Sequence, residues 1–136
     1  MTRTGSDYLN KVSDGRTIYL DGQLIENAVE HPAFRNAVRT VARLYDFQAA
    51  PENQELMTFE SPTSGGRVNR FWQLPRSYEE LVQRREAITA WAELTHGFMG
   101  RSPDHVGSSL CGMVMGIDLF EGHGEERAKA LMDYFT

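Results

Sequence analysis

The feature that most constrains the fold is a helix break and restart between residues 97 and 107. Gly97 and Gly100 interrupt the long apolar-patterned segment before them, because glycine is a poor residue for a helix interior. Ser102 is suited to cap a new helix, and Pro103 suits its first position, where a missing N–H costs nothing. The chain is therefore expected to place one helix before this junction and another after it.

The same junction holds the candidate site residues Arg101 and His105, which are four residues apart. Arginine is a permanent cation and histidine titrates near neutral pH, so a facing pair is suited to hold a phenolate or another oxyanion. An arginine and a histidine near a helix start are also common as surface or capping residues. The residues alone leave both interpretations open.

Apolar spacing and cap signals predict a mainly helical domain around this junction. Helices are expected from Thr4 or Ser6 to Asp14, from His31 to about residue 45, from Ser77 to about Phe98, over 103–114 and over 125–134. Asp21-Gly22 between two apolar runs predicts a β-hairpin. Residues 56–59 and 68–72 form two further candidate strands around a loop, and 118–124 reads as a connector.

The spacing also predicts which side chains are buried. The second helix is expected to bury a stripe made of Phe34, Ala37, Val38, Val41 and Tyr45, and to expose Arg35, Arg39 and Arg43. The long helix is expected to bury Leu81, Ile88, Ala92, Thr95 and Met99, with Val82, Trp91 and Phe98 at the margin of the stripe. Cys111 is expected to be a core residue.

Composition excludes several classes of function. The chain has 136 residues, which fits one domain, and its formal net charge of −5 argues against nucleic acid or an anionic membrane as the main partner. One cysteine excludes an intramolecular disulfide, and no metal-ligand spacing is present, so no metal is expected. No signal-peptide pattern or membrane span is found in the sequence, which makes a cytoplasmic location the expectation.

Several blocks in order along the chain resemble one enzyme family, the 4-hydroxyphenylacetate 3-monooxygenase oxygenase family. The blocks are residues 14–19 (Asp-Gly-Arg-Thr-Ile-Tyr), 31–38, 44–46, 85–88 and 99–104 (Met-Gly-Arg-Ser-Pro-Asp). The resemblance implies the helical N-terminal domain of an acyl-CoA-dehydrogenase-like flavoenzyme, occupying residues 1–136. A flavin-binding β domain and a C-terminal helical bundle would follow, so the fragment alone is expected to be inactive.

The resemblance also implies a function. Family members are oxygenase components that hydroxylate a phenolic substrate with O₂ and reduced FAD, which a separate NAD(P)H-dependent flavin reductase supplies. It assigns Arg101 and His105 to the phenol hydroxyl as catalytic and substrate-binding residues, and it implies a homo-oligomer. Most flavin contacts would lie beyond residue 136.

The sequence departs from the family pattern at one position, and two alternative functions stay open. His105 stands where relatives that act on phenylacetates usually carry a tyrosine, which leaves the identity of the substrate open. A flavin-dependent hydroxyacyl-CoA dehydratase is one alternative, although that branch needs several cysteine and histidine ligands. A non-catalytic helical module that mediates association is the other.

Overall fold

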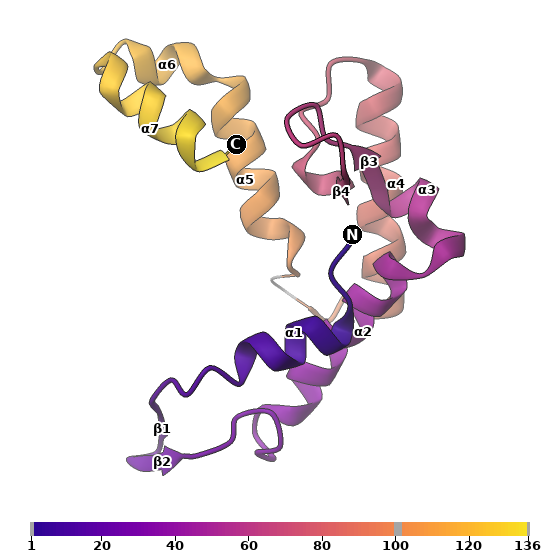
Figure 1. Cartoon of the computed structure of the whole chain (residues 1–136), viewed down its shortest axis with the longest axis vertical. Helices are drawn as coiled ribbons and strands as arrows, with labels where there is room; N and C mark the ends of the chain where they lie inside the picture. The colour runs from indigo at the N-terminus through magenta and orange to yellow at the C-terminus, as the bar shows by residue number, and fades with distance from the viewer. Residues whose placement is uncertain (1, 100–101, 136) are drawn as a thin grey trace.

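The computed structural model describes residues 2–99 and 102–135, and helices dominate it (Figure 1). The elements, in chain order, are α1 (Gly5–Val12), β1 (Ile18–Leu20), β2 (Gln23–Ile25), α2 (Arg35–Ala49), the 3₁₀ turn η1 (Pro51–Asn53), α3 (Gln54–Met57), β3 (Thr58–Glu60), β4 (Arg67–Asn69), the 3₁₀ turn η2 (Arg70–Trp72), α4 (Tyr78–Leu94), α5 (Asp104–Met115), α6 (Ile117–Glu121) and α7 (Glu125–Phe135). The predicted mainly α fold with a small β component is confirmed, with two small hairpins.

Local sequence signals account for α1 and the first hairpin. The Thr4 hydroxyl accepts a hydrogen bond from the Asp7 amide, and the Asp7 carboxylate accepts one from the Thr4 amide, which closes a capping box. At the β1–β2 turn, Asp21 and Gly22 have φ angles of 51° and 77°. Both residue types tolerate this left-handed region, so the hairpin predicted from Asp-Gly is confirmed.

The second hairpin differs in its bounds from the prediction. β3 and β4 pair antiparallel, with Phe59 opposite Val68, so two strands do form in this region. Met57, however, ends α3, and Trp72 lies in η2, so neither belongs to a strand. The predicted strands at 56–59 and 68–72 are therefore only partly correct.

The predicted start of the second helix at His31 is wrong. The His31 carbonyl accepts hydrogen bonds from the amides of Phe34 and Arg35, each at 2.9 Å, so residues 31–34 form a turn before α2 begins. The buried face of α2 also differs from the predicted stripe, because Ala37, which the prediction buries, is exposed. The residues that α2 buries are Ala42, Leu44 and Gln48.

The long helix α4 ends four residues before the predicted end at Phe98. His96 and Gly97 adopt left-handed φ angles of 51° and 71°, which stop the helix. Its buried residues are Ala87 and Trp91, whereas Leu81 and Ala92 of the predicted stripe are exposed. Trp91 is thus a core residue, as its helical spacing favours.

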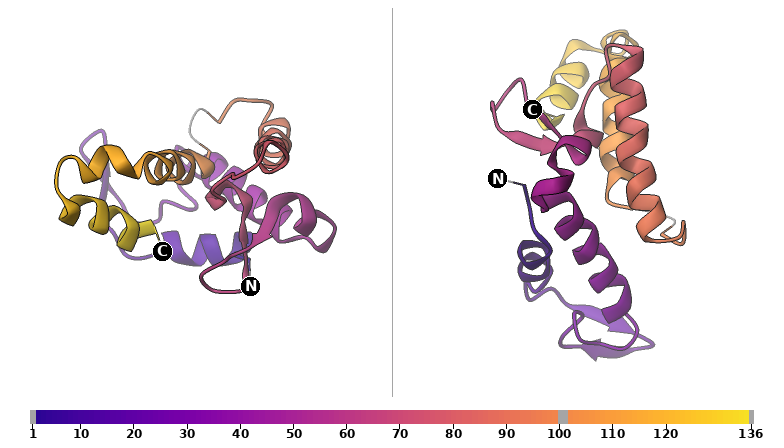
Figure 2. Two further views of the ribbon diagram at one scale, coloured as in Figure 1. Left: turned by 90° about the horizontal axis from the view of Figure 1, so that it is seen from above. Right: turned by 90° about the vertical axis from the view of Figure 1, so that its right-hand side faces the viewer.

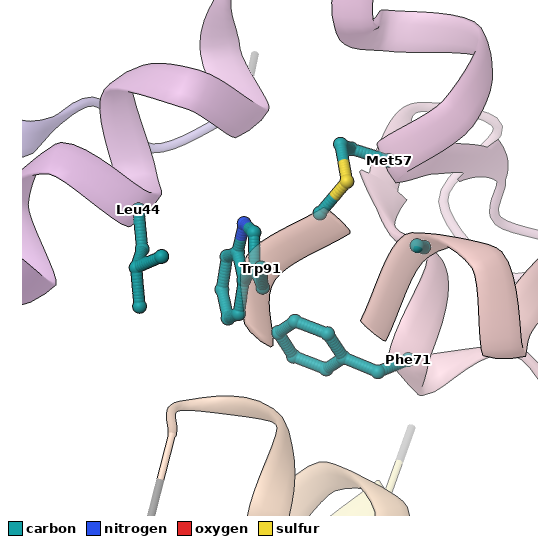
Figure 3. Packing of buried hydrophobic residues seen from close by; sticks show 5 residues of the cluster. Leu44, Met57, Phe71 and Trp91 are labelled. Atoms are coloured by element: carbon teal, nitrogen blue, oxygen red, sulfur yellow. The ribbon is translucent and has the colours of Figure 1, made fainter. Parts of the chain in front are cut away.

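The core is built around the Trp91 indole (Figure 3). In this view the indole lies between the Leu44 side chain on one side and those of Met57 and Phe71 on the other, with Ala87 completing the cluster. The Trp91 ring is tilted against the Phe71 ring at a centroid distance of 5.1 Å. The cluster therefore joins α2, α3, η2 and α4.

Three arms leave this core (Figures 1 and 2). One arm contains α1, the first hairpin and α2, the second contains α3, the second hairpin and α4, and the third contains α5 to α7. The predicted connector at 118–124 is partly wrong, because its first residues belong to the short helix α6. Over the described residues, no helix has the length and apolar character that a membrane span requires.

Candidate functional site

The predicted helix restart is confirmed, but its cap differs. α5 begins at Asp104, one residue later than predicted, with Pro103 at the preceding position. The Ser102 hydroxyl donates to the Asp104 carboxylate and makes no cap to the helix amides. The first turn is closed instead by the Ser102 carbonyl, which accepts from the His105 amide at 3.0 Å.

The structure describes only one of the two predicted site residues. His105 lies in the first turn of α5 and is exposed, and its carbonyl accepts from the Ser109 hydroxyl at 2.9 Å. Arg101 lies outside the described residues. The predicted pairing of the two side chains therefore stays a prediction.

One face of α5 is pressed against η2. The buried residues of this face are Asp104, Gly107, Cys111 and Val114, at the three- and four-residue spacing of one helix side. A Cβ on Gly107 would lie 3.1 Å from Phe71 Cδ2 and 3.4 Å from the Trp72 ring. The absence of a side chain at residue 107 therefore lets α5 approach both aromatic rings closely.

Cys111 is a core residue, as predicted. Its side chain is fully buried and its thiol donates to the Phe71 carbonyl at 3.3 Å. Burial raises the pKa of the Cys111 thiol, which keeps it protonated at neutral pH. A protonated, buried thiol is a structural group and not a nucleophile.

A hollow of about 860 Å³ opens beside the second hairpin, and we call it the hairpin hollow. It brings together both ends of the described chain, α2, the hairpin and η2. Its lining residues are Thr2, Arg3, Tyr45, Gln48, 59–64, 67–69, 71–74, Arg76, Glu80, Pro103 and Phe135. Pro103 connects the hollow to the start of α5, but His105 is not part of the lining.

The lining of the hairpin hollow is aromatic with a cationic margin. Trp72 contacts Phe135 at a ring-centroid distance of 6.2 Å. The Arg3 guanidinium lies 5.8 Å from the Tyr45 ring centroid, and Arg67 pairs with a glutamate of α3. These arginines are therefore already engaged within the chain.

The hairpin hollow was not foreseen from the sequence. Its walls come from segments far apart in the chain, and Gln48 and Asn69 carry no motif that marks a site. Both side chains are nevertheless buried, and the Gln48 Oε1 and Asn69 Nδ2 atoms have no hydrogen-bond partner within the described part of the chain. Spacing along the sequence gave no signal for either residue.

Within residues 2–99 and 102–135, no group of three or more histidine, cysteine, aspartate or glutamate side chains is arranged to hold a metal ion.

The chain is similar in sequence to oxygenase components of aromatic monooxygenases. The oxygenase component of 4-hydroxyphenylacetate 3-monooxygenase from Pseudomonas aeruginosa is 41% identical over 128 residues, which is 93% of this chain and 24% of that protein. The 4-nitrophenol 2-monooxygenase oxygenase component from a Rhodococcus species is 38% identical over 132 residues, or 96% of this chain and 25% of that protein. The chain thus spans about a quarter of the length of these relatives.

Solved structures give the same result for the fold. The crystal structure of HpaB, the oxygenase component of 4-hydroxyphenylacetate 3-monooxygenase, in complex with FAD and 4-hydroxyphenylacetate matches with a TM-score of 0.87 at 33% identity, covering 98% of this chain and 27% of that one. A 4-hydroxybutyryl-CoA dehydratase from N. maritimus matches with a TM-score of 0.76 at 28% identity, covering 99% and 27%.

The family model described as the N-terminal part of 4-hydroxyphenylacetate 3-hydroxylase matches residues 4–136. That range includes every element from α1 to α7 and the junction that carries Arg101 and His105. The chain therefore belongs to the 4-hydroxyphenylacetate 3-hydroxylase family.

Proposed function

We propose that residues 1–136 form the helical N-terminal domain of the oxygenase component of a two-component, FAD-dependent aromatic monooxygenase. The observation that carries this proposal is the family match over residues 4–136, together with a TM-score of 0.87 to HpaB bound to FAD and 4-hydroxyphenylacetate. A flavin-binding β domain and a C-terminal helical bundle would supply the rest of the enzyme. The fragment alone is then inactive.

The proposed reaction inserts one oxygen atom of O₂ into a phenol ring. The second oxygen atom leaves as water, and reduced FAD, delivered by a separate flavin reductase, supplies the two electrons. Phenols are the proposed substrate class, because the relatives are named for 4-hydroxyphenylacetate and 4-nitrophenol. The protein would act in the cytoplasm as a homo-oligomer.

Two residues of this sequence would act on the phenol hydroxyl. An electrophilic oxygen transfers faster to a phenolate than to a phenol, and the guanidinium of Arg101 would stabilise the phenolate. The exposed His105 side chain would donate a hydrogen bond to the same oxygen or accept its proton. His105 in place of the tyrosine usual in phenylacetate hydroxylases is then a determinant of which phenol is bound.

Most of the flavin contacts are proposed to lie outside this sequence. Five glycines have positive φ angles, and a Cβ added to any of them would meet no atom within 4 Å. Such glycines serve turns. The flavin would therefore be held mainly by residues outside this sequence.

The hydroxylase proposal is favoured over a hydroxyacyl-CoA dehydratase by identity. Among the solved structures, HpaB is 33% identical with a TM-score of 0.87, whereas the dehydratase is 28% identical with a TM-score of 0.76. The sequence also has a single cysteine, Cys111, which is buried against η2. The family match favours an enzyme over a non-catalytic association module.

The experiment that tests the proposal uses the full-length protein with reduced FAD, O₂ and 4-hydroxyphenylacetate or a panel of simple phenols. We expect Arg101→Ala to lower the rate of hydroxylation about ten- to a hundredfold, as expected for a lost charge-assisted hydrogen bond. The fraction of consumed oxygen that appears in hydroxylated product should fall as well. Arg43→Ala, an exposed arginine of α2, is the matched control.

The outcome for His105 separates its two possible roles. His105→Tyr should retain most of the activity and change the preference among phenols, because both side chains form hydrogen bonds to an oxygen. His105→Ala should shift the pH profile of hydroxylation if the imidazole carries the proton. Unchanged hydroxylation in Arg101→Ala would contradict the assignment of the site.

A further inference from the structure

Arg84 links three segments of the chain. From α4, its Nη2 atom donates to the Phe71 carbonyl of η2 and to the Ser108 hydroxyl of α5, each at 2.9 Å. The side chain is half-buried, and no carboxylate of the described chain forms an ion pair with it. The Nη2 atom is therefore committed to neutral acceptors that belong to two other elements, while the buried Nε atom has no partner among the described residues.

The contacts around Arg84 all meet one side of α5. The Phe71 carbonyl that accepts from Arg84 also accepts from the Cys111 thiol at 3.3 Å. One turn earlier, the Cα of Gly107 approaches the Phe71 and Trp72 rings so closely that a Cβ would be 3.1 Å from Phe71 Cδ2. Together these contacts determine the rotation of α5 about its own axis and its position along η2.

The rotation of α5 determines where His105 points. Ser108 is three residues after His105, so the two positions are neighbours on the helix surface. After α4 the chain turns through the left-handed residues His96 and Gly97. Among the described residues, the bond from Arg84 to Ser108 joins the second turn of α5 to α4.

We infer that Arg84 is a positioning residue for the proposed phenol site: through Ser108 and the Phe71 carbonyl it holds the first two turns of α5, and so His105, in place. This inference rests on the proposed function. Arg84 does not touch the substrate in this account. It acts through α5, and displacement of a binding group by about 1 Å is enough to lower a rate by two orders of magnitude.

The test uses full-length protein and four variants. Arg84→Met removes the donors and keeps an unbranched apolar chain, Arg84→Lys keeps one charged donor, and Ser108→Ala removes only the acceptor on α5. Arg43→Met, on the exposed face of α2, is the matched control. The measurements are KM and kcat for 4-hydroxyphenylacetate, hydroxylated product per O₂ consumed, and amide hydrogen exchange over residues 104–109.

We expect Arg84→Met and Ser108→Ala to raise KM and to lower kcat/KM about tenfold, because a displaced His105 no longer meets the phenol oxygen in the productive geometry. Product per O₂ should fall, and amide exchange over residues 104–109 should become faster. Arg84→Lys should recover part of the loss, and Arg43→Met should match the parent protein. Ser108→Ala keeps the Arg84 bond to η2, so it tests the inference even if Arg84→Met does not fold.

Three results would overturn the inference, and they are distinguishable. If His105→Ala and Arg101→Ala impair hydroxylation while Ser108→Ala and Arg84→Met behave like Arg43→Met, Arg84 has no positioning role. If the Arg101 and His105 variants hydroxylate normally, the proposed function of the junction fails, and the inference fails with it. A lower melting temperature of the Arg84 variants with unchanged KM and product yield would also contradict it.

Discussion

At the scale of single residues, Arg70 organises the second arm of the molecule. Its side chain is 8% exposed, and each of its five N–H groups finds an acceptor. Nε and Nη2 donate to the carbonyls of Leu56, Glu55 and Thr58 at 2.6–2.8 Å, and Nη1 donates to the side chains of Gln73 and Gln83. Burial lowers the pKa of the Arg70 guanidinium, but arginine remains charged in proteins.

Arg70→Met should therefore destabilise the chain strongly. The substitution leaves three backbone carbonyls without their donor, and an unsatisfied buried polar group costs about 1–3 kcal/mol. We expect the free energy of unfolding, measured with urea, to fall by roughly 3 kcal/mol or more. Arg67→Met is the control, because Arg67 is exposed and its pair with Glu55 should contribute less than about 1 kcal/mol. Equal losses in the two variants would contradict this account.

At the scale of elements, α1 is held on α2 by a backbone contact that only glycine permits. The Gly5 amide donates to Asp46 Oδ1 at 2.8 Å. A Cβ on Gly5 would lie 2.5 Å from both the Ala42 carbonyl oxygen and Asp46 Oδ2. The two helices therefore meet at their closest point through a position without a side chain.

Gly5→Ala should destabilise the chain even though alanine is the better helix former. We expect the clash with α2 to outweigh the gain in helix propensity and to lower the free energy of unfolding by about 1–3 kcal/mol. Ser6→Ala, at the exposed neighbouring position, should change it by less than about 0.5 kcal/mol. An equal or more stable Gly5→Ala variant would show that α1 moves away from α2 without loss.

Elements with local signals were predictable from the sequence, whereas their packing was not. The Asp21-Gly22 turn and the Thr4 cap depend only on neighbouring residues, so the sequence predicts them correctly. The buried faces of α2 and α4 depend on which elements cover them. Leu44 and Ala87 face the Trp91 cluster, while Leu81, in an equally apolar row, is 51% exposed because no described element covers it.

The candidate site shows the same division. The helix restart at residues 102–104 has a local signal, and the structure places α5 there. The hairpin hollow and the Arg84 bridge have none, because the bridge joins residues 13 and 24 positions apart and the hollow joins opposite ends of the chain. Only the folded arrangement brings these groups together.

At the scale of the whole molecule, the chain is unusually open. Its accessible surface is 9371 Å², whereas a compact monomer of 15.4 kDa has roughly 7,200 Å². Several large apolar side chains are exposed, and Phe98 is 92% exposed. Exposed apolar surface of this kind is typical of interfaces. The three arms visible in Figure 1 therefore fit a domain that packs against the remainder of a larger protein.

The isolated 136-residue chain should accordingly not hold FAD tightly. The glycines with positive φ angles lie in open turns, and the arginines Arg3 and Arg67 beside the hairpin hollow are already engaged. We expect a fluorescence titration to show no low-micromolar binding. Saturable binding in that range would show that this domain contains the flavin site and would contradict the proposed division of the enzyme.

We propose that the full-length protein inserts one oxygen atom of O₂ into a phenol. The most direct measurement is turnover of 4-hydroxyphenylacetate under ¹⁸O₂ with reduced FAD, followed by mass spectrometry of the product. We expect a product whose dihydroxylated ring carries one ¹⁸O atom, and we expect it to form only when reduced FAD is supplied. Product oxygen derived from water, or no hydroxylated product from 4-hydroxyphenylacetate and a panel of simple phenols, would contradict the claim.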